Sequence, residues 1–287
     1  INYYFSLLFE MNKARKIILH GLFNTRLIFI VAMQPWLLKK CYWVIWGGDL
    51  YAYQLNKQTY TWWRKEIFRR FVIRRIGNFI TQVKGDYELA QQWYGATGEL
   101  HNSFMYPSNL YSTGVTHSLP HEGINILLGN SAGRSNNHIE VLHNLKPYAG
   151  EEIKVYCPLS YGDQGYAQQV SAYGTLHFGE KFIALREFMP LDKYIELLSK
   201  MDVAIFNHER QQGMGNITTL LGMGKKVFLR KDITTRSFLE NLGITVFDVN
   251  SIELSKLDRS VSVENMRIVK NCFSKANLVA QLQGIFQ

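Results

Sequence analysis

Residues 124–138 read INILLGNSAGRSNNH, and residues 203–216 read VAIFNHERQQGMGN. In both stretches a short, largely apolar run passes into a polar loop that contains glycine, and the loop leads into a helical pattern. Short apolar runs are typical of strands in a parallel sheet that is covered on both faces. The two stretches therefore predict two strand–loop–helix units in one α/β sheet.

The alternation of strand-like and helix-like segments continues on both sides of these units. In the C-terminal part we predict strands at residues 124–128, 153–157, 182–185, 203–206, 226–229 and 245–247, with helices at 136–145, 163–173, 191–200, 216–223, 234–242 and 263–282. In the N-terminal part we predict strands at 16–20, 42–46 and 78–82 and helices at 25–38, 57–75 and 87–94. Repeated strand–helix alternation predicts doubly wound α/β domains.

A change in composition suggests where one domain ends. Residues 105–122 contain Pro107, Gly114 and Pro120 but no Lys, Arg or Asp, which is typical of a linker. We predict a Rossmann-like N-terminal domain with its linker over 1–120 and a second Rossmann-like domain over 121–287, facing each other across a cleft. The last helix is long enough to pack back on the first domain.

The charge is divided unevenly between these two parts. Residues 1–120 hold 14 Lys and Arg against 6 Asp and Glu, whereas residues 121–287 hold 18 against 17. With 47% hydrophobic and 19% charged residues, the chain of 287 residues is not a disordered protein. A basic first half and a neutral second half predict different binding partners for the two domains.

Several protein classes are excluded by what the sequence lacks. Cys41, Cys157 and Cys272 lie far apart and form no CxxC pair, which argues against a disulfide scaffold or a zinc ribbon. The longest uncharged apolar run has twelve residues, at 27–38, and a bilayer span needs about 20. The absence of a Walker lysine argues against an NTPase, and no GxSxG nucleophile elbow is present. The histidines are scattered and no DxD stretch occurs, so we predict no metal site. The chain starts without Met, and we expect that it lacks its natural start.

The loops after the predicted strands carry the candidate ligand-binding residues, because ligands of open α/β sheets bind at the carboxyl ends of the strands. Small residues let a ligand approach the backbone, helix N-termini attract anions, and arginine adds a forked cation. We therefore predict a diphosphate site built from Gly129, Asn130, Ser131, Arg134, Ser135 and Asn136 in one loop and Asn207, Arg210, Gln211, Gln212, Gly213, Gly215 and Asn216 in the other. The alternative interpretation is a pair of ordinary solvated turns.

Three further residues are predicted to form the rim of the same site. Tyr161 follows the second strand of the C-terminal domain, and Glu187 and Phe188 follow the third. A nucleotide base could stack on these rings and donate to the carboxylate. Plain packing is the alternative for the aromatic side chains.

The N-terminal part offers two weaker catalytic candidates. Residues 43–51, WVIWGGDLY, end a predicted strand with paired glycines and Asp49, which we place at the mouth of the cleft, where it could accept a proton from a sugar hydroxyl. His20 follows the first strand in a similar position. The alternatives are a turn-capping Asp and a structural His.

The predicted helix over 57–75 is strongly basic and rich in aromatic residues. We predict that Trp62, Trp63, Arg69, Arg70, Arg74 and Arg75 face an anionic membrane or the phosphates of a lipid-linked substrate. Nucleic acid is a competing partner for the same charges. A solvated helix whose apolar stripe packs inward is the structural alternative.

Three of these motifs together resemble one family. Residues 43–51, residues 129–131 (GNS) with 134–139 (RSNNHI), and residues 210–215 (RQQGMG) are similar to the bacterial 4-acetamido-4,6-dideoxygalactose (Fuc4NAc) transferases, glycosyltransferase family 56. The resemblance extends from about His20 to Leu229. That family moves Fuc4NAc from a dTDP donor to an undecaprenyl-diphosphate-linked saccharide in the synthesis of enterobacterial common antigen.

The resemblance implies a GT-B glycosyltransferase without cofactor or metal, which binds the donor in its C-terminal domain and the acceptor in its N-terminal domain. It implies a peripheral protein on the cytoplasmic face of the bacterial inner membrane, with no nucleic-acid partner. Residues 209–215 also resemble the EGxG loop of retaining GT-B families, but the acid that follows there is absent here, which leaves the stereochemistry open. A UDP-sugar donor and a non-catalytic basic binding module are the alternatives.

Overall fold

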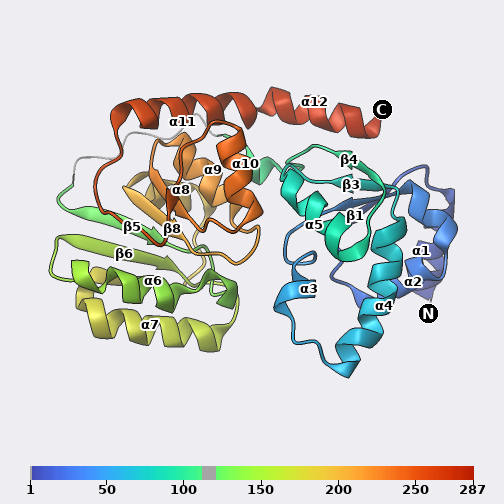
Figure 1. The fold of residues 1–287 in the computed structure, drawn as a ribbon, viewed down its shortest axis with the longest axis horizontal. Coiled ribbons are helices and arrows are strands. Elements are labelled where there is room, and N and C mark those ends of the chain that lie inside the picture. Colours follow the sequence, from blue (N-terminus) through green and yellow to red (C-terminus); the bar gives the residue numbers. More distant parts are fainter. Residues whose placement is uncertain (1, 112–120) are drawn as a thin grey trace. The chain divides into compact units, whose positions relative to one another are not determined.

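The computed structural model describes residues 2–111 and 121–287, which fold as two compact units. Unit 1 comprises Ile1–Met105 together with Leu278–Gln287, and unit 2 comprises Tyr106–Asn277 (Figure 1). The predicted domain boundary at 120/121 adjoins residues outside the described range.

Unit 1 is built on a parallel sheet of four strands in the order β1-β2-β3-β4. The strands are β1 (Ile17–His20), β2 (Cys41–Val44), β3 (Asn78–Ile80) and β4 (Glu99–His101). The helices are α1 (Asn2–Lys13), α2 (Thr25–Ala32), α3 (Ala52–Leu55), α4 (Tyr60–Arg75) and α5 (Lys84–Tyr94), with a 3₁₀ turn η1 (Pro35–Lys40). Trp43 and Phe79 are fully buried on adjacent strands and their rings pack together.

Unit 2 contains a parallel sheet of six strands in the order β10-β9-β8-β5-β6-β7. The strands are β5 (Ile124–Leu128), β6 (Ile153–Pro158), β7 (Phe182–Leu185), β8 (Val203–Phe206), β9 (Lys226–Leu229) and β10 (Phe247–Asp248). The chain adds strands on one side of β5 and then on the other, so the strand order reverses between β5 and β8. That junction is the switch point at which open α/β sheets bind ligands.

Helices cover both faces of this second sheet. They are α6 (His138–Leu145), α7 (Gln164–Phe178), α8 (Leu191–Ser199), α9 (Met214–Gly222), α10 (Thr234–Asn241) and α11 (Arg259–Cys272). The last helix, α12 (Lys275–Phe286), belongs to unit 1 from Leu278 onward. Figure 1 shows α6 and α7 on one side of the sheet and α9 and α11 on the other. Short 3₁₀ turns complete the unit: η2 (Pro107–Asn109), η3 (Arg134–Asn136), η4 (Lys146–Tyr148) and η5 (Gly179–Lys181).

The predicted fold class, α/β with two Rossmann-like units, is confirmed by these two parallel sheets. Some element boundaries were wrong. The helix expected over 25–38 ends at Ala32, because Pro35 starts a separate 3₁₀ turn. The helix expected over 263–282 is two helices, since α11 ends at Cys272 and α12 begins at Lys275. The sequence analysis did not predict α1 or the short edge strand β4.

Candidate functional site

The two polar loops that follow β5 and β8 are joined by a set of hydrogen bonds. At the end of β5 the Gly129 amide donates to the Ile205 carbonyl (2.9 Å). Further along, Ser135 Oγ donates to Gln212 Oε1 (2.9 Å), and Gln212 Nε2 donates to Asn130 Oδ1 (2.8 Å). Gln212 thus bridges both ends of the first loop, and the structure brings the two predicted loops into one site.

The side chain of Asn136 holds the first loop in place through hydrogen bonds. It is fully buried, and its Oδ1 accepts from the Asn130 amide (3.1 Å) and lies 2.9 Å from His208 Nε2. Its Nδ2 donates to the Gly133 carbonyl (2.9 Å). One side chain therefore fixes the turn at both ends and joins it to the loop after β8.

His138 and His208 are fully buried beneath these loops. Burial lowers the pKa of His138 to about 4 and is the largest cause that lowers the pKa of His208 to about 3, with the Arg210 charge second. Both side chains are therefore neutral at physiological pH. Because Asn136 donates its Nδ2 protons to oxygen atoms, its Oδ1 faces His208, which fixes His208 as the donor at Nε2.

Glycine is required at two turning points of the site. Gly129 has φ +67°, and a Cβ there would lie 2.5 Å from His138 Nε2. Gly213, also at φ +67°, precedes α9, where a Cβ would lie 3.0 Å from His208 Cε1. Gly215 follows in the first turn of α9, whose amide groups have no intrahelical acceptor. This is the local geometry at which a helix attracts an anion.

The two predicted arginines are held in different ways. Arg134 forms an exposed ion pair with Asp163 (2.8 Å) and lies over the Tyr166 ring. Asp163 caps α7 by accepting from the Tyr166 amide (3.0 Å); that bond, followed by the bond from Arg134, lowers the pKa of this carboxyl group. Arg210 donates to the Gln211 carbonyl (3.1 Å) at the start of the second loop. Both guanidinium groups are thus next to the loops.

A hollow of about 240 Å³ opens beside Asn130, at the ends of β6 and β7. Among its lining residues are four that the sequence predicted together with Asn130: Tyr161, Glu187, Phe188 and Asn216. Asn130 Nδ2 donates to Tyr161 Oη (3.2 Å), and Asn216 Nδ2 donates to the hydroxyl of the half-buried Tyr194 (2.9 Å). Phe188 is 87% exposed, so its ring is available for stacking on a ligand.

Other predicted members of the loops have mainly structural positions or remain without a partner. Ser131 Oγ accepts from the Gly133 amide (3.4 Å), so it stabilises the turn itself. Asn207 is buried and its Oδ1 has no hydrogen-bond partner among the described residues.

The sequence analysis missed several residues of this site. Asp163, Tyr194 and His208 each make a defining contact there. Asp163 carried a usable signal, because it follows a predicted strand and directly precedes a helix, as an N-cap does. Nothing in the sequence around Tyr194 or His208 indicates their burial.

In unit 1 the geometry speaks against the catalytic role predicted for Asp49. The carboxylate is fully buried and accepts four N–H groups: Oδ1 from Trp46 N and Leu50 N (3.0 Å each), and Oδ2 from Leu22 N (2.9 Å) and Trp43 Nε1 (2.7 Å). With both oxygens occupied, it anchors the loops after β1 and β2. His20 is exposed at the end of β1, and its predicted catalytic role stays a prediction.

The basic helix α4 also differs from the prediction that its arginines face a membrane. Arg69 donates to the backbone carbonyls of Leu22 (3.1 Å) and Asp49, and Arg70 donates to the Trp93 carbonyl (2.9 Å). These two half-buried side chains hold unit 1 together. Arg74 and Arg75 are exposed, and so is Trp63, whereas Trp62 is half-buried.

The part of the chain that the structure describes lacks two kinds of feature. The described residues contain no group of three or more His, Cys, Asp or Glu side chains placed to bind a metal ion. None of the helices in this part of the chain combines the length and apolar character that crossing a bilayer requires.

Solved structures of glycosyltransferases share this fold at low sequence identity. Sucrose-phosphate synthase from Thermosynechococcus elongatus matches with a TM-score of 0.69 and 9% identity, over 96% of this chain and 73% of that one. A glycosyltransferase from Rickettsia africae matches with 0.66 and 12%, over 97% and 78%. HepE (Alr3699) from Anabaena, solved with UDP-glucose, matches with 0.60 and 13%, over 98% and 76%. These likenesses establish the GT-B fold.

The family is established by sequence. The sequence model described as "4-alpha-L-fucosyltransferase glycosyl transferase group 56" matches residues 8–270, most of the chain. This range contains both loops of unit 2 and the Asp49 loop of unit 1. The chain therefore belongs to glycosyltransferase group 56 and is a glycosyltransferase of the GT-B fold.

Proposed function

We propose that the protein transfers Fuc4NAc or a related dideoxy amino sugar from a dTDP-sugar to a lipid-linked saccharide, as in the synthesis of enterobacterial common antigen or O-antigen. The donor would bind in unit 2, with its diphosphate over the joined loops and its base in the adjoining hollow. The observation that carries this assignment is the Gln212 bridge, which sets the start of α9 beside the turn that contains Asn130.

The charges in this region suit a leaving nucleoside diphosphate. As the glycosidic bond breaks, negative charge grows on the departing phosphate. The free amides at the start of α9 stabilise that charge, and the guanidinium groups of Arg134 and Arg210 stabilise it further. Arg134 would exchange its exposed partner Asp163 for the ligand, at small cost because exposed ion pairs are weak.

The hollow beside Asn130 would take the base. Phe188 and Tyr161 offer exposed rings for stacking, and Glu187 offers a carboxylate to an imide N–H. Thymine and uracil share that imide and differ by one methyl group. Such a difference in an apolar pocket is worth about 1–3 kcal/mol, so a preference for dTDP over UDP of about tenfold or more is expected.

The acceptor side rests on the family resemblance and on the charge of unit 1. A lipid diphosphate at the cytoplasmic face of the inner membrane would meet the basic half of the chain. We propose that the protein is peripheral there and that transfer needs no metal. Product formation from a dTDP-sugar and a lipid-linked disaccharide, followed by thin-layer chromatography with and without EDTA, tests the acceptor and the metal independence of the transfer.

Calorimetric titration with dTDP, UDP, GDP and ADP tests the donor site. Binding of dTDP above the others is expected, and Arg134→Ala or Arg210→Ala should each weaken it by about 1.5–3 kcal/mol, the range of a charge-assisted hydrogen bond. Arg267→Ala, which removes an exposed arginine of α11 paired with Glu264, is the matched control. Preference for UDP would overturn the sugar nucleotide but keep the site. Unchanged affinity in both variants would remove the site.

A further inference from the structure

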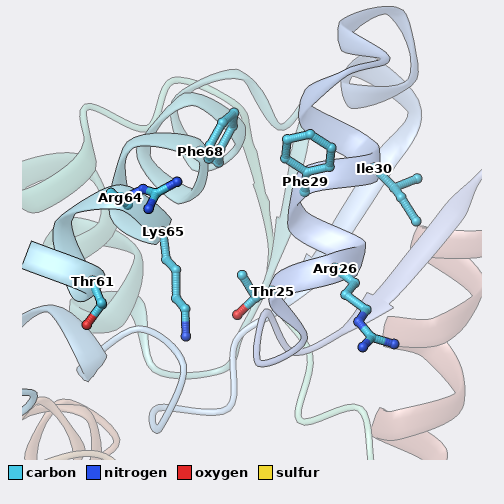
Figure 2. A pocket seen from close by; sticks show the side chains of 8 residues that line it. All are labelled: Thr25, Arg26, Phe29, Ile30, Thr61, Arg64, Lys65 and Phe68. Carbon is cyan, nitrogen blue, oxygen red and sulfur yellow. The ribbon is translucent and has the colours of Figure 1, made fainter.

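A separate, mainly apolar groove lies on the surface of unit 1 between α2 and α4. It has a volume of about 620 Å³. Figure 2 shows Phe29 of α2 and Phe68 of α4 facing each other across it, and their rings meet edge to face with centroids 5.1 Å apart. The groove extends over α2 to Ile30 and Arg26. None of these residues belongs to the donor site.

A second, polar hollow of about 420 Å³ adjoins the groove along α4. Thr25, Thr61 and Lys65 line both spaces, so they mark the junction between an apolar and a polar compartment. Lys57 and Arg69 line the polar side, together with the carboxylate of Glu66. An apolar channel that continues into a hydroxyl- and cation-lined hollow matches a molecule with a hydrocarbon chain and an anionic head.

The charge around the groove has one sign. Arg64 and Lys65 are exposed and make no ion pair within the described residues. The sequences of α2 and α4 contain a single carboxylate, Glu66, which is 2% exposed and lies 3.7 Å from Arg70. Among the residues that the structure describes, the apolar groove is thus lined by no acidic side chain, and in the polar hollow Glu66 is outnumbered by Lys57, Lys65 and Arg69, which complements a phosphate.

Further exposed apolar side chains neighbour the groove residues in the sequence of both helices. Met33 lies four residues after Phe29 at the end of α2, and Ile67 is adjacent to Phe68 on α4; both are 62% exposed. Residues four apart share a helix face, so Met33 and Phe29 project together. A soluble ligand would need only the groove itself. Exposed apolar residues next to the groove residues in sequence fit the interface of a bilayer, where such side chains are buried among lipid chains.

We propose that the α2–α4 groove binds one anionic membrane phospholipid, with an acyl chain against Phe29 and Phe68 and its phosphate at Thr61 and Lys65. This inference does not depend on the sugar or nucleotide in the proposed function. The proposed surface differs from the one predicted from the sequence: Arg69 and Arg70 are bonded to backbone carbonyls of unit 1, and residues of α2 take part instead.

Vesicle binding tests the surface. The full chain should sediment with phosphatidylglycerol vesicles and much less with phosphatidylcholine vesicles. Arg64→Glu/Lys65→Glu should weaken binding by about 30-fold or more, since each basic residue near an anionic surface contributes about fivefold. Phe29→Ser/Phe68→Ser should weaken it as well. Controls of equal chemistry are Lys193→Glu/Lys200→Glu and Leu176→Ser, which change exposed residues of unit 2.

A monomeric lipid tests the groove itself. Dihexanoyl phosphatidylglycerol below its micelle concentration should bind in calorimetry, and Thr61→Trp should abolish that binding by filling the junction. Vesicle binding without binding of the monomer would overturn the groove assignment. Equal competition by inorganic phosphate would show that the groove is only an anion site. If the protein does not bind vesicles but is a dimer that Phe29→Ser/Phe68→Ser dissociates, the groove would instead be the contact with a second copy. Circular dichroism verifies that each variant is folded.

Discussion

Replacing Asp49 with Asn separates a structural role for this residue from a catalytic one. The carboxylate accepts four N–H groups in a site without exposed surface. An amide keeps one acceptor oxygen and turns an NH₂ group toward the other two donors, which then lose their partner. Each unsatisfied buried donor costs about 1–3 kcal/mol, so Asp49→Asn should lower the unfolding free energy of unit 1 by about 3–4 kcal/mol.

Urea unfolding followed by tryptophan fluorescence is the assay, because Trp43 itself donates to Asp49. With a urea slope of about 2 kcal/mol per M, the midpoint should fall by about 1.5–2 M. Trp43→Phe, which removes one of the four donors, should cost less, and Asp192→Asn on exposed α8 should change the midpoint little. A folded Asp49→Asn protein with the wild-type midpoint and no transferase activity would refute the structural reading and restore the catalytic one.

Three further predictions concern unit 2. Asn136→Ala strands the Asn130 amide and His208 Nε2; it should lower the unfolding free energy by about 2–4 kcal/mol in urea titrations and weaken nucleotide binding, and an intact affinity would mean that the turn holds its shape unaided. Because burial lowers the pKa of His138 to about 4 and of His208 to about 3, the unfolded state takes up more protons below its own pKa near 6.5; stability should be constant above pH 7 and fall by about 2 kcal/mol between pH 7 and 5.5, with roughly half of that loss absent in His138→Phe. Gly129→Ala puts a Cβ 2.5 Å from His138 Nε2 at positive φ and should cost about 1–3 kcal/mol in thermal unfolding, whereas Gly150→Ala, in open space, should cost less than 1 kcal/mol.

Local sequence patterns account for most of the fold and for part of the site. Short apolar runs predicted all six strands of unit 2, since a strand buried on both faces needs no partner to be identified. The edge strand β4 was missed because Glu99 and His101 make it polar and because it has only three residues. Its pairing with β3 is a tertiary property that no local window contains.

The same distinction applies to individual side chains. Glycine and polar residues after a strand locate the loops at 129–136 and 207–216, but they do not show whether a given side chain faces a ligand or the protein. Asp49 looked like an exposed carboxylate in a turn, and it is buried by donors from four separate positions. Arg69 and Arg70 form part of a basic run in the sequence, yet they bind backbone carbonyls that are distant in sequence, at Leu22 and at Trp93 in α5. Burial of this kind depends on contacts across the whole unit.

The last residues of the chain belong to the unit that is synthesised first. Leu278 and Ile285 are buried in unit 1, and Gln281 accepts from the Phe104 amide (3.2 Å). On the ribosome, Ile1–Met105 therefore emerges long before the segment that completes it, while all of unit 2 is synthesised in between. Until then unit 1 is incomplete, and the surface that α12 covers is exposed. Unit 2 can fold before unit 1 is complete. A nascent chain stalled shortly after Asn277 would therefore lack the helix that completes unit 1.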